Sequence, residues 1–537
     1  MKADLIFLNG DIATLDHEIP AASALAVSGD RFLAVGANGE ILKLADDKTE
    51  FVDLAGKTVT PGFIETHAHL SLYALTLLQI DCSSPLNSSI EDVKSRIKAK
   101  ANDLEHGQWI KGWGFDDTLI KEKRHLARAD LDECAPHNPV SIDHISGHLM
   151  YANSLSLEMA GIGPKTPSPA GGKIYKGKNG KPTGRLGEEA QILVSGQMPP
   201  PDVAELTKAI STAIQHFQAC GISSTHDGAI GYYGEGTEVI QAYQALEKEE
   251  RLDLRVYLTL VADLYMEILQ SGLESKLNSN FLKLGSVKVF QDGSIQALTA
   301  ALTEPYYKDR EYRGDMIHSQ AGLEKLVDKY QQAGRQVAIH ANGDRAIESC
   351  LQALERANKR FPGKDLRHMI IHCQMAGPDH IRRMKELGVI PSYFINHIFY
   401  WGDRHLSTFL GPQRSERLSL LNSSIKAGLN FTLHSDLPVT PVAPLFAMHC
   451  AVNRTTKKGQ VLGASERISP LSAIRAYTEH AAYCSFEENI KGTITKGKLA
   501  DFVVLSDNPL NVAPDKIRNI RVLETIVGGK TVYRDNH

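Results

Sequence analysis

Long apolar runs are missing from this 537-residue sequence, and no stretch reaches the roughly 20 residues that a helix needs to cross a bilayer. Residues 1–10 also lack the apolar core and small-residue cleavage site of a signal peptide. No charge of one sign dominates, because 59 Lys and Arg stand against 63 Asp and Glu, for a net charge of −4. We therefore expect a cytoplasmic protein that binds neither nucleic acid nor a membrane.

Cysteine is scarce, and its spacing points to no special chemistry. The seven cysteines form no CxxC pair and are odd in number, which favours reduced, buried thiols over a disulfide framework. The remaining composition, 42% hydrophobic and 23% charged, is that of a globular protein. Because the chain is too long for one hydrophobic core, we expect one large domain and at least one smaller one.

Both ends of the chain consist of short apolar runs separated by turns. Residues 4–8 and 31–35 flank Asn-Gly and Ser-Gly-Asp turns, and residues 501–505 and 531–533 repeat this texture near the C-terminus. Two termini of the same kind predict one small β-sandwich domain, built from residues 1–58 and 490–537.

The middle of the chain, residues 59–489, alternates apolar strands with amphipathic helices. Most of the strands are continuous apolar runs, as expected of parallel strands that are buried on both faces. Eight candidate strands follow one another at 62–66, 222–226, 255–260, 285–290, 336–340, 369–372, 389–392 and 431–435. The pattern predicts an α/β fold, a distorted TIM (β/α)8 barrel.

One segment interrupts this alternation after the first barrel strand. Residues 70–207 are far too many for a barrel loop. We predict that they form an inserted subdomain over the barrel mouth.

The first barrel strand ends in His67 and His69. Residues two apart on a strand point to the same side, so both imidazoles can reach one metal ion. A His-x-His pair can occur by chance, but this one follows a Pro-Gly turn and an apolar strand, and other ligand types occur at later strand ends. We interpret the pair as metal ligands.

Three later strands also end in polar residues, namely His340, His372 and Asp436. A single histidine at a strand end is more often a satisfied core residue than a ligand. Because the carboxyl ends of barrel strands converge on one mouth, however, all three are expected to lie near the His-x-His pair. Together they predict a metal site.

Lys288 places a charge inside an apolar strand, where an unpaired ammonium is costly. One interpretation is an amine that loses its proton on desolvation and adds carbon dioxide, which gives a carbamate that bridges two metal ions. The other is a lysine at the barrel rim that pairs with Asp292. The residues alone leave both open.

These features together resemble the amidohydrolase superfamily, and more closely its YtcJ-like or amidohydrolase 3 branch, which includes N-substituted formamide deformylase. The resembling stretches run nearly end to end, at residues 59–69, 112–116, 287–294, 339–346, 372–374 and 492–501. The resemblance implies a barrel that binds one or two divalent ions, with His67, His69, carboxylated Lys288, His340, His372 and Asp436 as ligands. Zn²⁺ is the expected ion, and Mn²⁺, Fe²⁺ and Co²⁺ suit the same ligands. Asn342 departs from the apolar residue of many relatives but leaves the ligand set intact.

The activity implied is hydrolysis of a C–N bond, an N-acyl or N-formyl amide of a small molecule, by a metal-activated water. As a hypothesis, Asp436 orients that water, takes its proton and passes it to the leaving amine. Three alternatives stay open: a metal-dependent deaminase, a hydrolase of cyclic amides or lactones, and a non-catalytic binding or regulatory relative. Relatives that deaminate rings generally use one metal and lack the barrel lysine. A homodimer is the base-rate expectation.

Substrate contacts are harder to place than ligands, because specificity resides in loops. Trp113 and Asp116 lie in a Gly-rich turn, His226 ends a barrel strand, and Trp401 belongs to an aromatic segment after the seventh strand. The predicted set of substrate-binding residues is Trp113, Asp116, His148, His226, Asp292 and Trp401.

Overall fold

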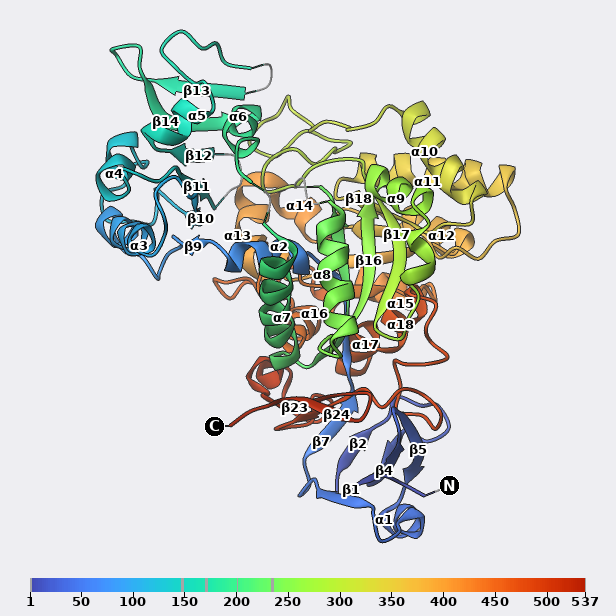
Figure 1. The fold of residues 1–537 in the computed structure, drawn as a ribbon. Coiled ribbons are helices and arrows are strands. Elements are labelled where there is room, and N and C mark those ends of the chain that lie inside the picture. The colour runs from blue at the N-terminus through green and yellow to red at the C-terminus, as the bar shows by residue number, and fades with distance from the viewer. Residues whose placement is uncertain (1, 146–148, 170–171, 200, 233–235, 537) are drawn as a thin grey trace. The chain divides into compact units, whose positions relative to one another are not determined.

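The computed structural model describes residues 2–536 except 146–148, 170–171, 200 and 233–235 (Figure 1). The chain divides into two compact units. Unit 1 comprises Met1–Ser71 with Ser211–His537, and unit 2 comprises Leu72–Ile210. No helix of the described part is long and apolar enough to cross a membrane.

Unit 1 contains an eight-stranded parallel sheet that forms a nearly closed barrel. Its order along the sheet is β8 (Phe63–Ala68), β15 (Ile222–Ile230), β16 (Arg255–Val261), β17 (Leu282–Phe290), β18 (Val337–Ala341), β19 (Met369–His372), β20 (Ile390–Phe394) and β21 (Thr432–His434). Most of the strand residues are buried, as the continuous apolar runs predict. The predicted TIM-barrel fold is confirmed.

Helices follow most of the barrel strands. They are α8 (Thr237–Lys248), α9 (Ala262–Gln270), α10 (Gln320–Gln332), α11 (Asp344–Arg360), α12 (Pro378–Leu387), α13 (His397–Arg404), α14 (Gly411–Ser415), α15 (Leu421–Lys426), α16 (Pro444–Asn453), α17 (Pro470–Ala476) and α18 (Glu479–Cys484). Local sequence sets their ends. Ser319 accepts a hydrogen bond from Gly322 N at the start of α10. Helix α12 begins at Pro378 and is followed by the left-handed Gly388, with φ 67°.

The two termini form a pair of mixed sheets in unit 1, the first from N-terminal strands and the second from strands of both ends. One has the order β5 (Arg31–Gly36), β4 (Ala24–Ser28), β1 (Leu5–Leu8) and β6 (Glu50–Asp53), next to α1 (Asn38–Ile41). The other has the order β24 (Lys530–Arg534), β23 (Val522–Val527), β22 (Phe502–Leu505), β7 (Thr58–Pro61), β2 (Asp11–Ala13) and β3 (Ala21–Ala22). Phe7 and Phe502 meet in their common core, with ring centroids 5.0 Å apart. Because β7 leads directly into β8, this core anchors the strand that carries His67.

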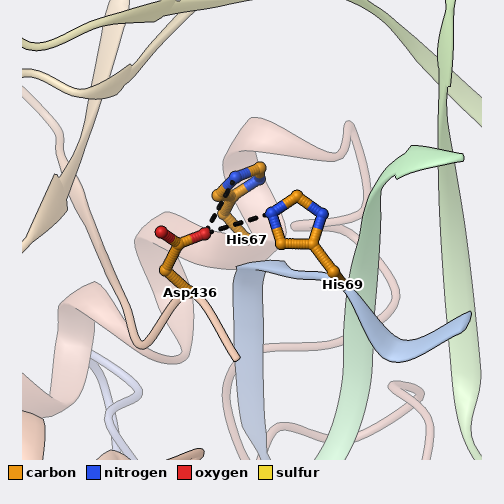
Figure 2. Close-up of side chains that lie close together, drawn as sticks. All are labelled: His67, His69 and Asp436. Carbon is orange, nitrogen blue, oxygen red and sulfur yellow. Dashed lines mark ion pairs between the residues drawn. The ribbon is translucent and has the colours of Figure 1, made fainter. Parts of the chain in front are cut away.

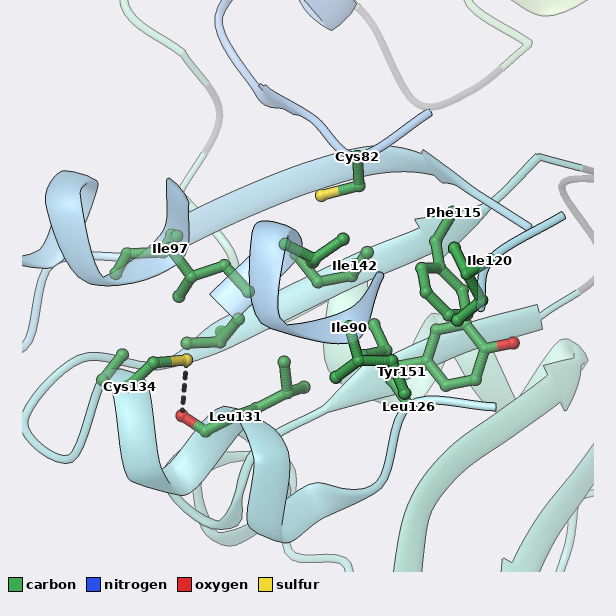
Figure 3. Close-up of a cluster of buried hydrophobic side chains, with 14 residues drawn as sticks. Cys82, Ile90, Ile97, Phe115, Ile120, Leu126, Leu131, Cys134, Ile142 and Tyr151 are labelled. Carbon is green, nitrogen blue, oxygen red and sulfur yellow. Dashed lines mark hydrogen bonds between the residues drawn. The ribbon is translucent and has the colours of Figure 1, made fainter. Parts of the chain in front are cut away.

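Unit 2 is built on a mixed sheet of its own, in the order β13 (Gly172–Lys176), β14 (Pro182–Glu188), β12 (Leu149–Ala152), β11 (Val140–His144), β10 (Ile110–Phe115) and β9 (Ile80–Asp81). Its helices include α3 (Ile90–Asn102), α4 (Arg128–Cys134), α5 (Ser154–Met159) and α6 (Ile192–Ser195). Helices α2 (Leu70–Leu77) and α7 (Val203–Ala219) cross the boundaries between the units. Ile97, Phe115, Ile142 and Tyr151 belong to the buried core of unit 2 (Figure 3). Its placement over the barrel mouth stays a prediction.

Candidate metal centre

The end of β8 and the residues after β21 bring three predicted ligands together. The Nε2 atoms of His67 and His69 lie 3.4 and 3.2 Å from Asp436 Oδ1 (Figure 2). Their possible ligand atoms all lie within 4.8 Å of one another. His67 and Asp436 are buried, whereas the His69 side chain is 15% exposed. The group is therefore enclosed, and His69 lies toward its accessible side.

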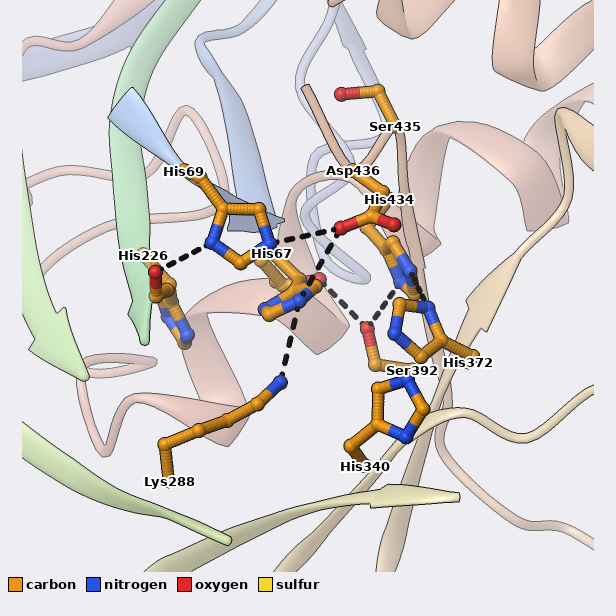
Figure 4. Close-up of polar contacts among 12 residues, drawn as sticks. His67, His69, His226, Lys288, His340, His372, Ser392, His434, Ser435 and Asp436 are labelled. Carbon is orange, nitrogen blue, oxygen red and sulfur yellow. Dashed lines mark hydrogen bonds and ion pairs between the residues drawn. The ribbon is translucent and has the colours of Figure 1, made fainter. Parts of the chain in front are cut away.

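The other three predicted ligands join this group from the consecutive strands β17, β18 and β19 (Figure 4). Lys288 Nζ, from β17, lies 3.4 Å from His67 Nε2. The ring of His372, from β19, lies 5.3 Å from the ring of His67 and 4.6 Å from that of His340, centroid to centroid. The six residues that we call the metal cluster are His67, His69, Lys288, His340, His372 and Asp436.

Neighbouring groups orient the imidazoles of the metal cluster. His69 Nδ1 lies 2.6 Å from Gly228 O, so it donates there and leaves Nε2 as the ring atom that faces Asp436. His372 Nδ1 lies 3.0 Å from His434 Nε2, and His434 Nδ1 lies 2.8 Å from Ser392 Oγ. The ring of His434 also stacks on Phe394, with centroids 5.5 Å apart. These contacts hold the three imidazole rings in fixed orientations, and so determine which ring nitrogen of each is engaged in a hydrogen bond.

Two buried atoms of the metal cluster, Asp436 Oδ1 and His340 Nδ1, have no hydrogen-bond partner among the residues that the structure describes. His340 Nδ1 lies 3.3 Å from Asp292 Oδ1, without hydrogen-bond geometry. A buried polar atom without a partner is costly, and a cation would satisfy both atoms. Imidazole nitrogens with a carboxylate are a donor set for Zn²⁺ and related divalent ions. The residues therefore fit a divalent metal.

Burial shifts the pKa values of three residues of the metal cluster. It lowers the pKa values of His67 and His372 well below the ordinary histidine value, and neighbouring cationic groups add to the effect. Burial also lowers the pKa of Lys288 to about 7, against the opposing influence of Asp436. Neutral imidazoles keep the lone pairs that metal binding requires.

Backbone strain marks the same strand ends. His372 and Asp436 have φ values of 70° and 59°, in the left-handed region that non-glycine residues rarely occupy. Each such residue costs on the order of 1–3 kcal/mol, and such residues gather at functional sites. The strained backbone thus coincides with two residues of the metal cluster.

The predicted substrate-binding residues lie in varied surroundings. Asp292 is buried and accepts hydrogen bonds from the backbone N–H groups of Ala301, Asn342 and Gly343 at 3.0, 2.9 and 2.8 Å. His226 Nε2 lies 2.8 Å from Ser485 Oγ. Substrate contact by either residue stays a prediction.

The remaining predicted contacts divide between the two units. Trp401, in α13, lies 6.2 Å from the Phe394 ring, centroid to centroid. Trp113 and Asp116 belong to unit 2, where Asp116 forms a second group of possible ligands with Asp117 and His144. His148 lies outside the described residues.

Two polar residues at the metal cluster, Glu65 and His434, were not singled out in the sequence. Glu65 is fully buried in β8, where burial raises its pKa to about 8. It carried the same signal as Lys288, a charge within an apolar strand. His434 stands two positions before Asp436, so a His-x-Asp pair begins at the last residue of β21, much as the His-x-His pair begins near the end of β8.

The fold and the metal cluster define a metal-dependent hydrolase barrel. An uncharacterized metal-dependent hydrolase from Pyrococcus furiosus superposes with a TM-score of 0.77 at 26% identity, over 94% of this chain and 100% of that chain. The amidohydrolase family model matches residues 50–533, and the chain belongs to this family. Putative amidohydrolase YtcJ of Bacillus subtilis is 30% identical over 99% of each chain. N-substituted formamide deformylase of Arthrobacter pascens is 29% identical, over 99% of this chain and 98% of its own.

Proposed function

We propose that the chain hydrolyses the carbon–nitrogen bond of a small N-acyl or N-formyl amine at the metal cluster. The observation that carries this proposal is Asp436 Oδ1, a buried acceptor without a hydrogen-bond partner, 3.2 Å from His69 Nε2. The similarity to N-substituted formamide deformylase of Arthrobacter pascens supports the choice of bond.

The residues that would hold the ion are His67, His69, Lys288, His340, His372 and Asp436, and we propose one or two Zn²⁺ ions. When bound, a divalent ion lowers the pKa of water and polarises a carbonyl oxygen. Because burial brings the pKa of Lys288 to about 7, a sizeable fraction of its amine is neutral at neutral pH. A neutral Nζ can add to carbon dioxide, forming an N–C bond and releasing one proton. The resulting carbamate is an anionic ligand where an ammonium would repel a cation.

Asp436 would move the proton during hydrolysis. Its carboxylate accepts a proton from the attacking water while the water oxygen forms a bond to the carbonyl carbon. It then returns that proton to the nitrogen as the C–N bond breaks, so that a carboxylic acid and a free amine leave. Burial keeps the group away from bulk water, which strengthens its interactions with the reacting atoms.

Aromatic residues beside the metal cluster would form one wall of the substrate site. Phe394 stacks on His434, and Trp401 packs against Phe394. Both lie in unit 1, on β20 and α13. We propose that Trp401 contacts the part of the substrate that does not react.

A hydrolysis screen of zinc-reconstituted protein tests this function. The panel contains N-formyl amines, N-acyl amino acids, cyclic amides, lactones and aminated heterocycles, with formate, free amine and ammonia assayed separately. We expect an acid and an amine in equal amounts, and about a thousandfold less of both from the Asp436→Asn protein prepared in parallel. Ammonia from heterocycles alone would replace this proposal with a deaminase, and loaded protein that cleaves no amide would contradict it.

A further inference from the structure

The barrel closes through isolated contacts at the place where the metal cluster lies. Parallel ladders join each neighbouring pair of strands from β8 round to β21, but within the described residues no ladder joins β8 to β21 directly. Asp436 N donates instead to His67 O at 3.1 Å, and His69 N donates to Leu437 O at 2.8 Å. The two sides of this seam carry His67 and His69 on one strand and Asp436 on the other. The spacing of these ligands therefore depends on the seam contacts.

Two neighbouring side chains of β8 span the seam: Thr66 Oγ1 donates to Thr432 Oγ1 at 2.9 Å, and Glu65 reaches the residue before Asp436. Its Oε2 accepts a hydrogen bond from Ser435 Oγ at 2.8 Å and from Ser435 N at 3.2 Å. Its Oε1 accepts from His67 N at 3.2 Å and from Ser435 N at 3.3 Å. One carboxyl group thus binds the backbone of His67 and that of the residue before Asp436. The side chain is 0% exposed, so water cannot replace these donors.

We propose that Glu65 is a positioning residue that sets the distance between the His-x-His pair and Asp436, and thereby the affinity of the metal cluster for its ion. This inference rests on the metal centre of the proposed function. Glu65 acts through main-chain groups and not through the reacting atoms. The contacts around a metal's own ligands typically change metal affinity by about 10- to 100-fold when lost.

The chain contains a matched control for this role. Glu466 is also buried, and its carboxylate likewise accepts two hydrogen bonds from one serine. Ser423 N donates at 3.0 Å and Ser423 Oγ at 2.7 Å. Ser423 lies in α15, and its hydrogen bonds to Glu466 involve no residue of the metal cluster. Loss of a buried Glu–Ser contact can therefore be compared at the seam and away from it.

The test compares Glu65→Gln with Glu466→Gln in the full-length protein. An amide places an N–H₂ donor where Glu65 now accepts from N–H and O–H groups. Chelator-treated protein is titrated with Co²⁺, followed by its visible absorption, and with Zn²⁺ in competition. We expect Glu65→Gln to bind both ions at least 10-fold more weakly than wild type, and Glu466→Gln to stay within about twofold. In steady-state assays, Glu65→Gln should lower kcat while KM changes little.

Equal Co²⁺ and Zn²⁺ affinities in Glu65→Gln and Glu466→Gln would overturn the proposal. If Glu65→Gln does not fold, Ser435→Ala replaces it, with Ser435→Thr as the variant that keeps the hydroxyl. Weaker binding in Ser435→Ala that Ser435→Thr restores supports the role, and wild-type affinity in Ser435→Ala contradicts it. Metal affinity is read without substrate. A failure of amide hydrolysis with an intact Glu65 effect would therefore reject the proposed function alone.

Discussion

Two of the buried polar groups among the described residues of unit 1 differ in whether their polar atoms have hydrogen-bond partners. In the first, the metal cluster, Asp436 Oδ1 and His340 Nδ1 have no hydrogen-bond partner. In the second, Lys491 Nζ lies 2.6 Å from Glu487 Oε2 and 2.7 Å from Ser224 Oγ, and His226 pairs with Ser485. Both groups place histidine and lysine in a medium of low dielectric constant, where unpaired groups are costly. The difference indicates that the second group supports the fold, whereas the first is built for a ligand.

The largest expected effect is a loss of turnover on substitution in the first group, the metal cluster. Asp436→Asn removes the proton acceptor but keeps the shape of the side chain, so kcat should fall about a thousandfold. Metal content should largely survive because the histidines and Lys288 remain. The measurements are steady-state turnover and metal analysis of the same preparation. Turnover within tenfold of wild type would remove Asp436 from its proposed role.

The second prediction concerns stability. Lys491→Met removes the nearer of two lysines that pair with the largely buried Glu487 carboxylate, since Lys283 Nζ stays 3.7 Å from its Oε1. The free energy of unfolding should fall by about 2 kcal/mol. Zn²⁺ affinity should stay within about twofold. Lys496→Met, at an exposed position, is the control and should change stability by less than about 0.5 kcal/mol. Urea unfolding measures the stability of both variants, and a zinc titration measures their metal affinity. A Lys491→Met protein that loses metal affinity without losing stability would reverse our assignment of the second group.

The smallest expected effect is a dependence on pH. Burial lowers the pKa of His226 to about 3, from an ordinary value of 6.5. The unfolded chain therefore binds a proton below pH 6.5 that the folded chain excludes, and stability present above pH 6.5 is lost as the pH falls from 6.5 toward 3. Between pH 6.5 and 5.5, His226→Gln should lose about 1 kcal/mol less unfolding free energy than wild type. Urea unfolding with chelator present measures this, and parallel losses in the two proteins would show that His226 is not held neutral.

The barrel and the metal cluster were predictable from the sequence for a local reason. Continuous apolar runs predict strands buried on both faces, and strands of one parallel barrel share a carboxyl edge. Where such a run ends in a polar residue, as at His340 or His372, that residue is therefore predicted to lie at the barrel mouth without knowledge of distant contacts. The structure brings all six predicted ligand residues into one cluster.

The contacts around the metal cluster depended on tertiary structure. Glu65 and Ser435 are 370 positions apart in the sequence, and no local pattern predicts their hydrogen bond. The ring contact from His434 to His372 likewise requires the lateral order of β19, β20 and β21. The surroundings of His226 and Asp292 could not be predicted for the same reason, because Ser485 and the Ala301 amide reach them from distant segments.

Metal analysis of the purified protein tests the central claim most directly. We predict at least one equivalent of zinc or a related divalent ion in zinc-supplied wild type, and its loss in His67→Ala/His69→Ala. Asp117→Asn, in the group of possible ligands in unit 2, should retain that equivalent. Wild type without a bound ion after zinc is supplied, or a double variant with undiminished content, would contradict the account.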